Sequence, residues 1–180
     1  MHARFDTDNR LAELINVDPT GRYHPNVIWI PVNDEMIEYL TDDYIVDRGK
    51  VQPPTLDYLR DQLKARLAEH RHTVETGGME LPNGSRVHTD RESQAQLTGA
   101  YQTLVTPFVE SIDWKGPDGW ITVTETELRP IAQAVALHVQ GCFKAERRVS
   151  EQITAAEDAE ALYAIDIAQA FGEALASTVS

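Results

Sequence analysis

Beyond residue 55 the chain repeats apolar residues at steps of three and four, the spacing of one face of a helix. From residue 56 such residues occupy one face while charged residues fill the other, and Gly77 and Gly78 supply a stop. This pattern predicts a helix of about 20 residues, roughly 30 Å long. Its apolar stripe consists of Leu56, Leu59, Leu63, Leu67 and Val74.

A longer helix is predicted from Thr126 to about Ala155, with Pro130 tolerated only near its first turn. Its apolar seam is the most regular in the chain and comprises Leu128, Ile131, Val135, His138, Cys142, Ala145 and Val149. Asp158 is placed to cap a last helix that runs to Leu175. Both seams suit either a core within the chain or a contact between subunits. For the first seam the spacing is mostly four, which favours an internal core.

The first 53 residues have shorter patterns. Residues 10–16 and 26–32 read as strands, and the second of these is apolar on both faces, as in a strand covered on two sides. Residues 33–47 begin with a capping Asn or Asp and suit a short helix. Pro53 and Pro54 then forbid a continuing helix, so we expect a module boundary there.

Two hairpins are predicted beyond the first long helix. Asn83 and Gly84 form a turn between residues 79–81 and 86–88, and a Gly-Pro-Asp-Gly turn joins two strands within residues 112–124. Between the hairpins, Thr89 and Glu92 have the spacing of a capping box that starts another helix.

These elements predict an α+β protein: a small β-containing N-terminal module, then a helical domain with two β-hairpins and a long helix. The predicted division is an N-terminal docking module at 1–53, a connecting amphipathic helix at 54–77 and an α+β domain at 78–180.

Charge and composition narrow the possible partners. The chain of 180 residues has a net charge of −13, which disfavours binding to nucleic acid and to anionic membranes. No apolar stretch is long enough to span a bilayer, and the polar start lacks the pattern of a signal peptide. A single cysteine excludes an internal disulfide framework and fits synthesis in a reducing cytoplasm.

The sequence shows no pattern of an enzyme: it lacks a glycine-rich phosphate loop, a cysteine and histidine metal cluster and a nucleophile elbow. We therefore expect no catalytic residue, cofactor or metal. His70 and His72 could hold a metal, but residues two apart on a helix point away from each other. His138 and Cys142, one helical turn apart in an apolar seam, are better explained as a packed histidine and an inert thiol.

Trp114 and Trp120 flank the second hairpin beside two aspartates. Exposed indoles could stack on a sugar ring, whereas packing over the long helices is the more ordinary role. The acidic runs contain carboxylates that could cleave glycans, but such pairs arise by chance in a chain this acidic.

Three blocks of the sequence carry a resemblance to a known family. The blocks are LPNGSRVHTDRESQAQLTGA, IDWKGPDGWITVTETEL and IAQAVALHVQGCFKAERRVSEQITAAEDAEAL. In this order and spacing they resemble a domain of unknown function found in bacteriophage tail-fibre and baseplate region proteins. The resemblance covers about residues 56–167 and brings no catalytic residues with it.

The resemblance implies a structural component of a phage tail, such as a baseplate or tail-fibre attachment adaptor, located in the virion after synthesis in the host cytoplasm. Expected partners are other tail proteins and further copies of the chain, with a trimer favoured if it follows fibre symmetry. A chaperone of tail-fibre assembly, absent from the mature virion, is the alternative, and a glycan-binding or glycan-degrading tail component is the least favoured. The apolar residues of the two helices, excluding His138, Cys142 and Ala145, are the candidate interface, and Trp114 and Trp120 are the candidate exposed aromatics.

Overall fold

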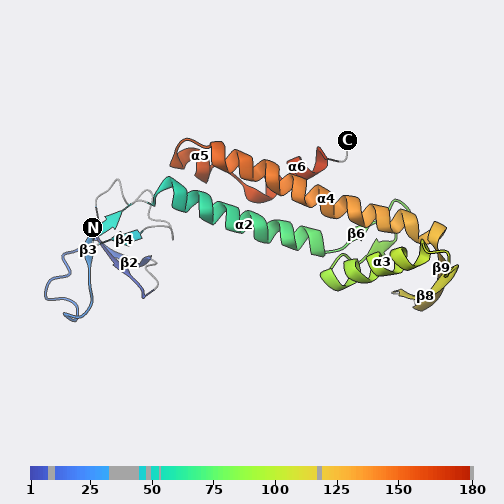
Figure 1. Ribbon diagram of the computed structural model, residues 1–180. Coiled ribbons are helices and arrows are strands. Elements are labelled where there is room, and N and C mark those ends of the chain that lie inside the picture. The colour runs from blue at the N-terminus through green and yellow to red at the C-terminus, as the bar shows by residue number, and fades with distance from the viewer. Residues whose placement is uncertain (8–10, 33–44, 48–49, 53, 117–118, 179–180) are drawn as a thin grey trace. The chain divides into compact units, whose positions relative to one another are not determined.

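A computed structural model describes the chain except residues 8–10, 33–44, 48–49, 53, 117–118 and 179–180 (Figure 1). The chain forms two compact units, Met1–Gln62 and Leu63–Ser180. The division falls inside helix α2 (Leu56–Thr76), downstream of the prolines at which the sequence predicts a boundary. The described residues form a β-containing N-terminal segment followed by helices and hairpins, so the α+β fold class is confirmed.

The N-terminal unit contains a three-stranded antiparallel sheet in the order β2-β1-β3. Its strands are β1 (His2–Phe5), β2 (Leu11–Ile15) and β3 (Ile30–Pro31). Ala3 of the central strand pairs with both neighbours and is fully buried. The strand predicted at 10–16 is thus confirmed. Only two residues of the strand predicted at 26–32 join the sheet, because the Val27 amide donates to the His24 carbonyl in a turn.

A separate antiparallel pair follows, made of β4 (Ile45–Asp47) and β5 (Lys50–Gln52). The helix predicted to end at residue 47 is therefore wrong over its last three residues. Ile45 and Val46 are β-branched and favour a strand. The rest of that predicted helix, residues 33–44, lies outside the described residues.

The C-terminal unit contains most of the helical structure, and the helix predicted from residue 56 and the two hairpins are confirmed there. After α2 the elements are β6 (Met79–Glu80), β7 (Arg86–Val87), α3 (Arg91–Leu104), β8 (Ser111–Gly116), β9 (Gly119–Thr124), α4 (Glu125–Ala155), α5 (Ala159–Tyr163) and α6 (Ile167–Ala176). Gly84 adopts a positive φ of 82° in the turn between β6 and β7, a conformation that favours glycine.

Helix α4 is 31 residues long and supports both halves of this unit. Its first half packs against α3 and the β8–β9 hairpin, and α6 lies along its second half (Figure 1). The core of the first half is formed by Leu97, Leu104, Leu128 and Val135. In the second half, large and fully buried apolar side chains are those of Phe171, Ile153, Leu162 and Val149.

The last predicted helix is broken into two. Asp158 caps α5 by accepting a hydrogen bond from the Ala161 amide, and Asp166 caps α6 through the Gln169 amide. A single helix from Asp158 to Leu175 is therefore wrong, because a second capping aspartate offers the backbone a new start.

Candidate functional site: the junction around Glu75

Glu75, in the last turn of α2, is a fully buried carboxylate. It forms an ion pair with Arg71, one turn earlier on the same helix, and with Arg91 in the first turn of α3. The distance from the Arg91 Nη1 to the Glu75 Oε1 is 2.9 Å, and Gln94 Nε2 approaches the same oxygen at 3.4 Å. Burial of an unpaired carboxylate costs roughly several kcal/mol. These partners offset that cost and allow Glu75 to lie inside the unit.

Arg71 also connects α2 to α4. Its Nε donates to Glu146 Oε2 over 3.0 Å, and its guanidinium lies 4.7 Å from the centre of the Phe143 ring. A second contact joins the same helices, since His138 Nε2 lies 3.3 Å from the Val74 carbonyl oxygen. The group of Arg71, Glu75, Arg91, Gln94 and Glu146, called here the Glu75 junction, thus holds α2, α3 and α4 together.

The Thr-Asp-Arg motif at 89–91 adjoins this junction: it contributes Arg91, and the Gln94 side-chain amide donates to the Thr89 carbonyl at 2.6 Å. Thr89 is fully buried, and its hydroxyl accepts a hydrogen bond from the Gly78 amide at 2.9 Å. Gly78 has a φ of +88°, and a Cβ there would lie 3.2 Å from the Val87 carbonyl, so the close approach favours glycine.

The capping box predicted for α3 from Thr89 and Glu92 is wrong. The cap is Asp90, which accepts from the Ser93 amide at 3.0 Å and from the Ser93 hydroxyl at 2.6 Å. These hydrogen bonds hold the pKa of Asp90 below its ordinary value. Thr89 is withdrawn from the cap by its contact with Gly78, which the sequence pattern does not reveal. A capping box is instead formed by Thr124 and Glu127 at the start of α4.

We expect Thr89→Val to destabilise the C-terminal unit by about 1 to 3 kcal/mol, because the Gly78 amide would lose its hydrogen-bond acceptor in a buried position. Thr89→Ser retains the hydroxyl and should cost clearly less. Chemical denaturation followed by circular dichroism measures both variants. Equal stability of Thr89→Val and the wild type would show that the hydrogen bond contributes nothing.

Sequence reasoning did not identify Glu75 or Arg91 as members of a site. A usable signal was present: Leu59, Leu63 and Leu67 step by four along α2, and the next two steps reach Arg71 and Glu75. A charged pair of opposite sign that continues an apolar stripe indicates a buried ion pair. The Glu75 carboxylate is already engaged by its arginines, so the arrangement stabilises the fold and presents no free acid or base.

The predicted interface residues lie largely inside the chain. In the C-terminal unit Leu63, Leu67, Leu128, Val135 and Val149 are buried, while Val74 and Ile131 are partly buried. Leu59 is buried and Leu56 partly buried. Of the two alternatives left open by the pattern, the internal core is therefore the one that the structure favours for the seams.

Cys142 is fully buried on α4, with its Sγ 3.9 Å from His138 Nε2. Burial raises the pKa of the Cys142 thiol, and the nearby Glu75 carboxylate raises it further.

Because the thiolate is the reactive form, we expect Cys142 to resist a disulfide reagent in the folded protein and to react at once in denaturant. Slow labelling of Cys142 in denaturant, or fast labelling of the folded protein, would contradict this expectation. The absorbance of the released thiol measures the rate.

The two tryptophans of the hairpin have different environments. Trp114 pairs with Ile121 and packs against the core, whereas Trp120 pairs with Lys115 on the opposite face and is 71% exposed. The Lys115 ammonium lies 5.8 Å from the centre of the Trp120 ring. The two indoles therefore do not form a joint platform for a sugar ring.

His70 is partly buried, with its ring edge against Phe171 at 5.1 Å between centroids, and His72 is exposed. Among the described residues no group of three or more His, Cys, Asp or Glu side chains could hold a metal ion. Nor does any described helix combine the length and the apolar character that a membrane crossing requires.

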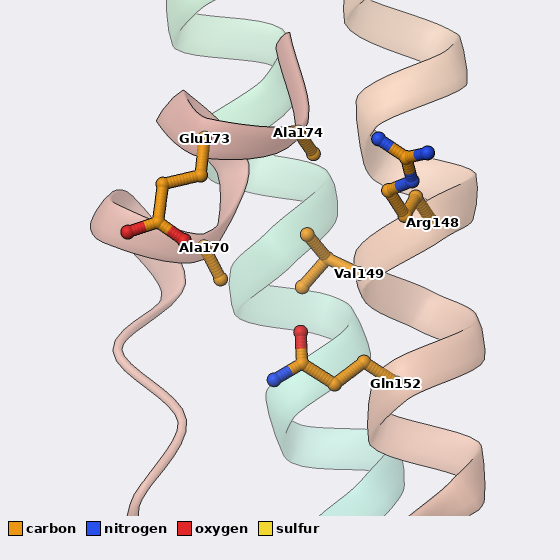
Figure 2. A pocket seen from close by; sticks show the side chains of 6 residues that line it. All are labelled: Arg148, Val149, Gln152, Ala170, Glu173 and Ala174. Atoms are coloured by element: carbon orange, nitrogen blue, oxygen red, sulfur yellow. The ribbon is translucent and has the colours of Figure 1, made fainter. Parts of the chain in front are cut away.

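Two open pockets lie on the C-terminal unit. One, of about 250 Å³, is lined by α4 and α6 through Arg148, Val149, Gln152, Ala170, Glu173 and Ala174 (Figure 2). Figure 2 shows its two charged groups, of Arg148 and Glu173, on opposite sides of Val149, and Arg148 donates to the Ser177 hydroxyl. The other, of about 490 Å³, lies between α2 and the start of α6, beside His70 and Asp166. The second pocket is also lined by Arg66 and Glu69, and neither pocket contains the Glu75 junction.

The comparisons with known proteins give one match. The model of a family described as "Domain of unknown function (DUF4376)" matches residues 58–169, which include the Glu75 junction, both hairpins and all of α4. No curated protein and no solved structure matches the chain significantly.

Proposed function

The chain belongs to the DUF4376 family of domains of unknown function. From its sequence blocks and its fold we propose that it is a structural component of a bacteriophage tail, an adaptor in the baseplate or at the tail-fibre attachment. It acts through protein–protein assembly and is located in the virion. The proposal takes its biological setting from the sequence blocks that resemble tail-fibre and baseplate region proteins.

The observation that supports an assembly role is that the motif residues make contacts within the fold. Thr89, Asp90 and Arg91 each bind a partner inside the fold: the Gly78 amide, Ser93 and the Glu75 carboxylate. These three residues therefore stabilise a scaffold, and this supports a role in which the surface of the scaffold binds other proteins.

The organisation of the chain supports an adaptor. The family match falls mainly in the C-terminal unit, while the N-terminal sheet lies outside it. Two compact units give a chain two surfaces for two neighbours. In the proposed role the N-terminal unit docks on one tail protein and the C-terminal unit on another, or on further copies of the chain.

Association between copies, as a trimer or otherwise, needs a surface other than the two apolar seams, because most of their side chains are buried within one chain. Exposed apolar side chains are available elsewhere on the C-terminal unit, such as Phe108 at 87% and Trp120 at 71% exposure. Large exposed aromatic side chains are common in protein–protein interfaces.

Quantitative peptide mass spectrometry on purified tailed particles, and on the lysate from which they come, tests the proposal. A fixed small ratio of this chain to known tail proteins in the particles is the expected result. Finding the chain only in the lysate, bound to the fibre polypeptide, would identify an assembly chaperone and overturn the structural role.

A further inference from the structure

The outward face of α4 is exposed along almost the whole helix. Its central part bears two exposed apolar side chains, Leu137 at 63% and Phe143 at 43% exposure, and the guanidinium of Arg71 on α2 lies beside the Phe143 ring. At 100° per residue these side chains flank Gln140, which is also exposed and lies at the middle of the face. The face runs from Arg129 near the start of the helix to Glu151 near its end.

The charge of this helix differs from that of the rest of the chain. Helix α4 (Glu125–Ala155) holds four basic and four acidic side chains, whereas the chain as a whole has 16 basic and 29 acidic ones. Glu125 and Glu127 lie in the first turn and Glu146 turns inward to Arg71, so from Arg129 to Glu151 the outward face has Glu151 as its single acid. A helix of balanced charge on an acidic chain does not repel a second copy of itself as strongly as the acidic surfaces would.

Residues at equal distances before and after Gln140 on this face suit each other as contact partners. Counting outward from Gln140 in both directions, Leu137 meets Phe143, and Arg129 meets Glu151. The positions between them match in the same way: Gln133 meets Arg147, and the small Ala136 meets the long Lys144. The two members of each pair lie on opposite sides of Gln140 along the helix. All of these residues, including Gln140, are exposed.

We propose that two copies of this chain form a dimer in which the outward faces of their α4 helices pack antiparallel, with a two-fold axis through Gln140. In this arrangement the Leu137 and Phe143 of one copy contact Phe143 and Leu137 of the other. About 16 Å from the axis at each end, Arg129 of one copy lies opposite Glu151 of the other. Antiparallel helices at a shallow crossing angle of about 20° remain in contact over such a length.

The two outer charges have intrachain partners that do not oppose this contact. Arg129 pairs with Glu125, and Arg147 with Glu151, each one turn apart on the exposed surface. Exposed ion pairs of this kind contribute little to stability. Arg129 and Glu151 can therefore leave their intrachain partners, or keep them, while they pair with each other across the dimer. Because the contact is isologous, each pair occurs twice.

The association state of the full chain tests the proposal. Light scattering coupled to size exclusion is expected to give twice the chain mass of 20.2 kDa across the micromolar range. Leu137→Glu should raise the dimer Kd about 100-fold, because each copy loses an apolar contact and places a charge against Phe143. Ile28→Glu, which changes a similarly exposed aliphatic residue of the N-terminal unit, should leave the Kd unchanged.

The melting curve separates loss of the dimer from loss of the fold, since Leu137 is exposed and its replacement should leave the helical signal of the monomer intact. A monomeric wild-type chain, a trimer, or a Leu137→Glu variant that remains dimeric would overturn the proposal. This outcome is independent of whether the chain is found in phage particles.

Cysteine crosslinking tests the position of the axis. Gln140→Cys is expected to form a disulfide between copies under mild oxidation, because the two residues face each other on the axis. Gln133→Cys alone should not, since its two copies lie about 21 Å apart along the helices. A dimer that crosslinks equally well through residue 133, or not at all through residue 140, would refute the antiparallel arrangement.

Charge exchange tests the ends of the contact. Arg129→Glu or Glu151→Arg alone should raise the dimer Kd about tenfold, because like charges then meet at both ends. The double variant restores opposite charges between copies and should return the Kd close to that of the wild type. Additive losses in the double variant would contradict the pairing of these two residues.

Discussion

Val135→Asp is expected to remove most of the stability of the C-terminal unit at 25 °C. Val135 is 5% exposed and packs with Leu97, Leu104 and Leu128 in the core between α3 and α4. An unpaired charge in this position, together with the lost apolar contact, costs more than about 4 kcal/mol. The total stability of a domain is about 5 to 15 kcal/mol, so most of it would be lost. Circular dichroism and denaturant titration measure the effect.

Leu137→Asp is the matched control for this prediction. Leu137 lies two residues further along the same helix but is 63% exposed, so the same substitution should change the free energy of unfolding of the monomer by no more than about 0.5 kcal/mol, apart from helix propensity. A folded, stable Val135→Asp monomer would indicate that the seam of α4 serves a contact between subunits and would contradict the internal core.

Arg71→Met is expected to destabilise the C-terminal unit by about 3 to 5 kcal/mol. Methionine keeps much of the apolar stem, but the fully buried Glu75 carboxylate loses its ion-pair partner on α2, and Glu146 loses the guanidinium that connects it to that helix. Arg91 remains, but it is 58% exposed and provides only part of the compensation. Urea denaturation of the variant and the wild type gives the difference in free energy.

Two further variants separate the loss of a buried pair from a general loss of charge. Glu75→Gln, added to Arg71→Met, removes the buried charge and should recover a substantial part of the stability, as a double-mutant cycle would show. Arg147→Met removes an 84% exposed arginine from α4 and should have an effect below about 1 kcal/mol. Equal effects of Arg71→Met and Arg147→Met would show that the Glu75 junction does not stabilise the unit.

Local patterns in the sequence predicted the main elements well. The apolar stripe from Leu56 and the glycines at 77 and 78 place α2 correctly, and the seam from Leu128 to Val149 falls within α4. Both hairpins follow from their turn residues. These elements are decided by periodicity and by backbone preferences of single residues, which are properties of the local chain.

Predictions failed where two local solutions were equally good. Thr89 and Asp90 are both favourable caps, and the contact of Thr89 with the distant Gly78 decides that Asp90 starts α3. Asp158 and Asp166 both start helices where one was expected. Ile45 and Val46 pair with a neighbouring strand instead of ending a helix. In the first case the deciding partner lies eleven residues away, beyond the helical pattern that suggests the cap.

The amino-acid sequence by itself determined the α+β class, the long seam of α4 and the acidic character of the chain, because each of these follows from the order or number of residue types. Only the tertiary structure decided that the seam is an internal core, that Arg71 and Arg91 converge on Glu75, and that Leu137 and Phe143 are left exposed. The physical reason is that burial and ion pairing depend on residues brought together from distant parts of the chain, and periodicity identifies a face of a helix without identifying what covers it.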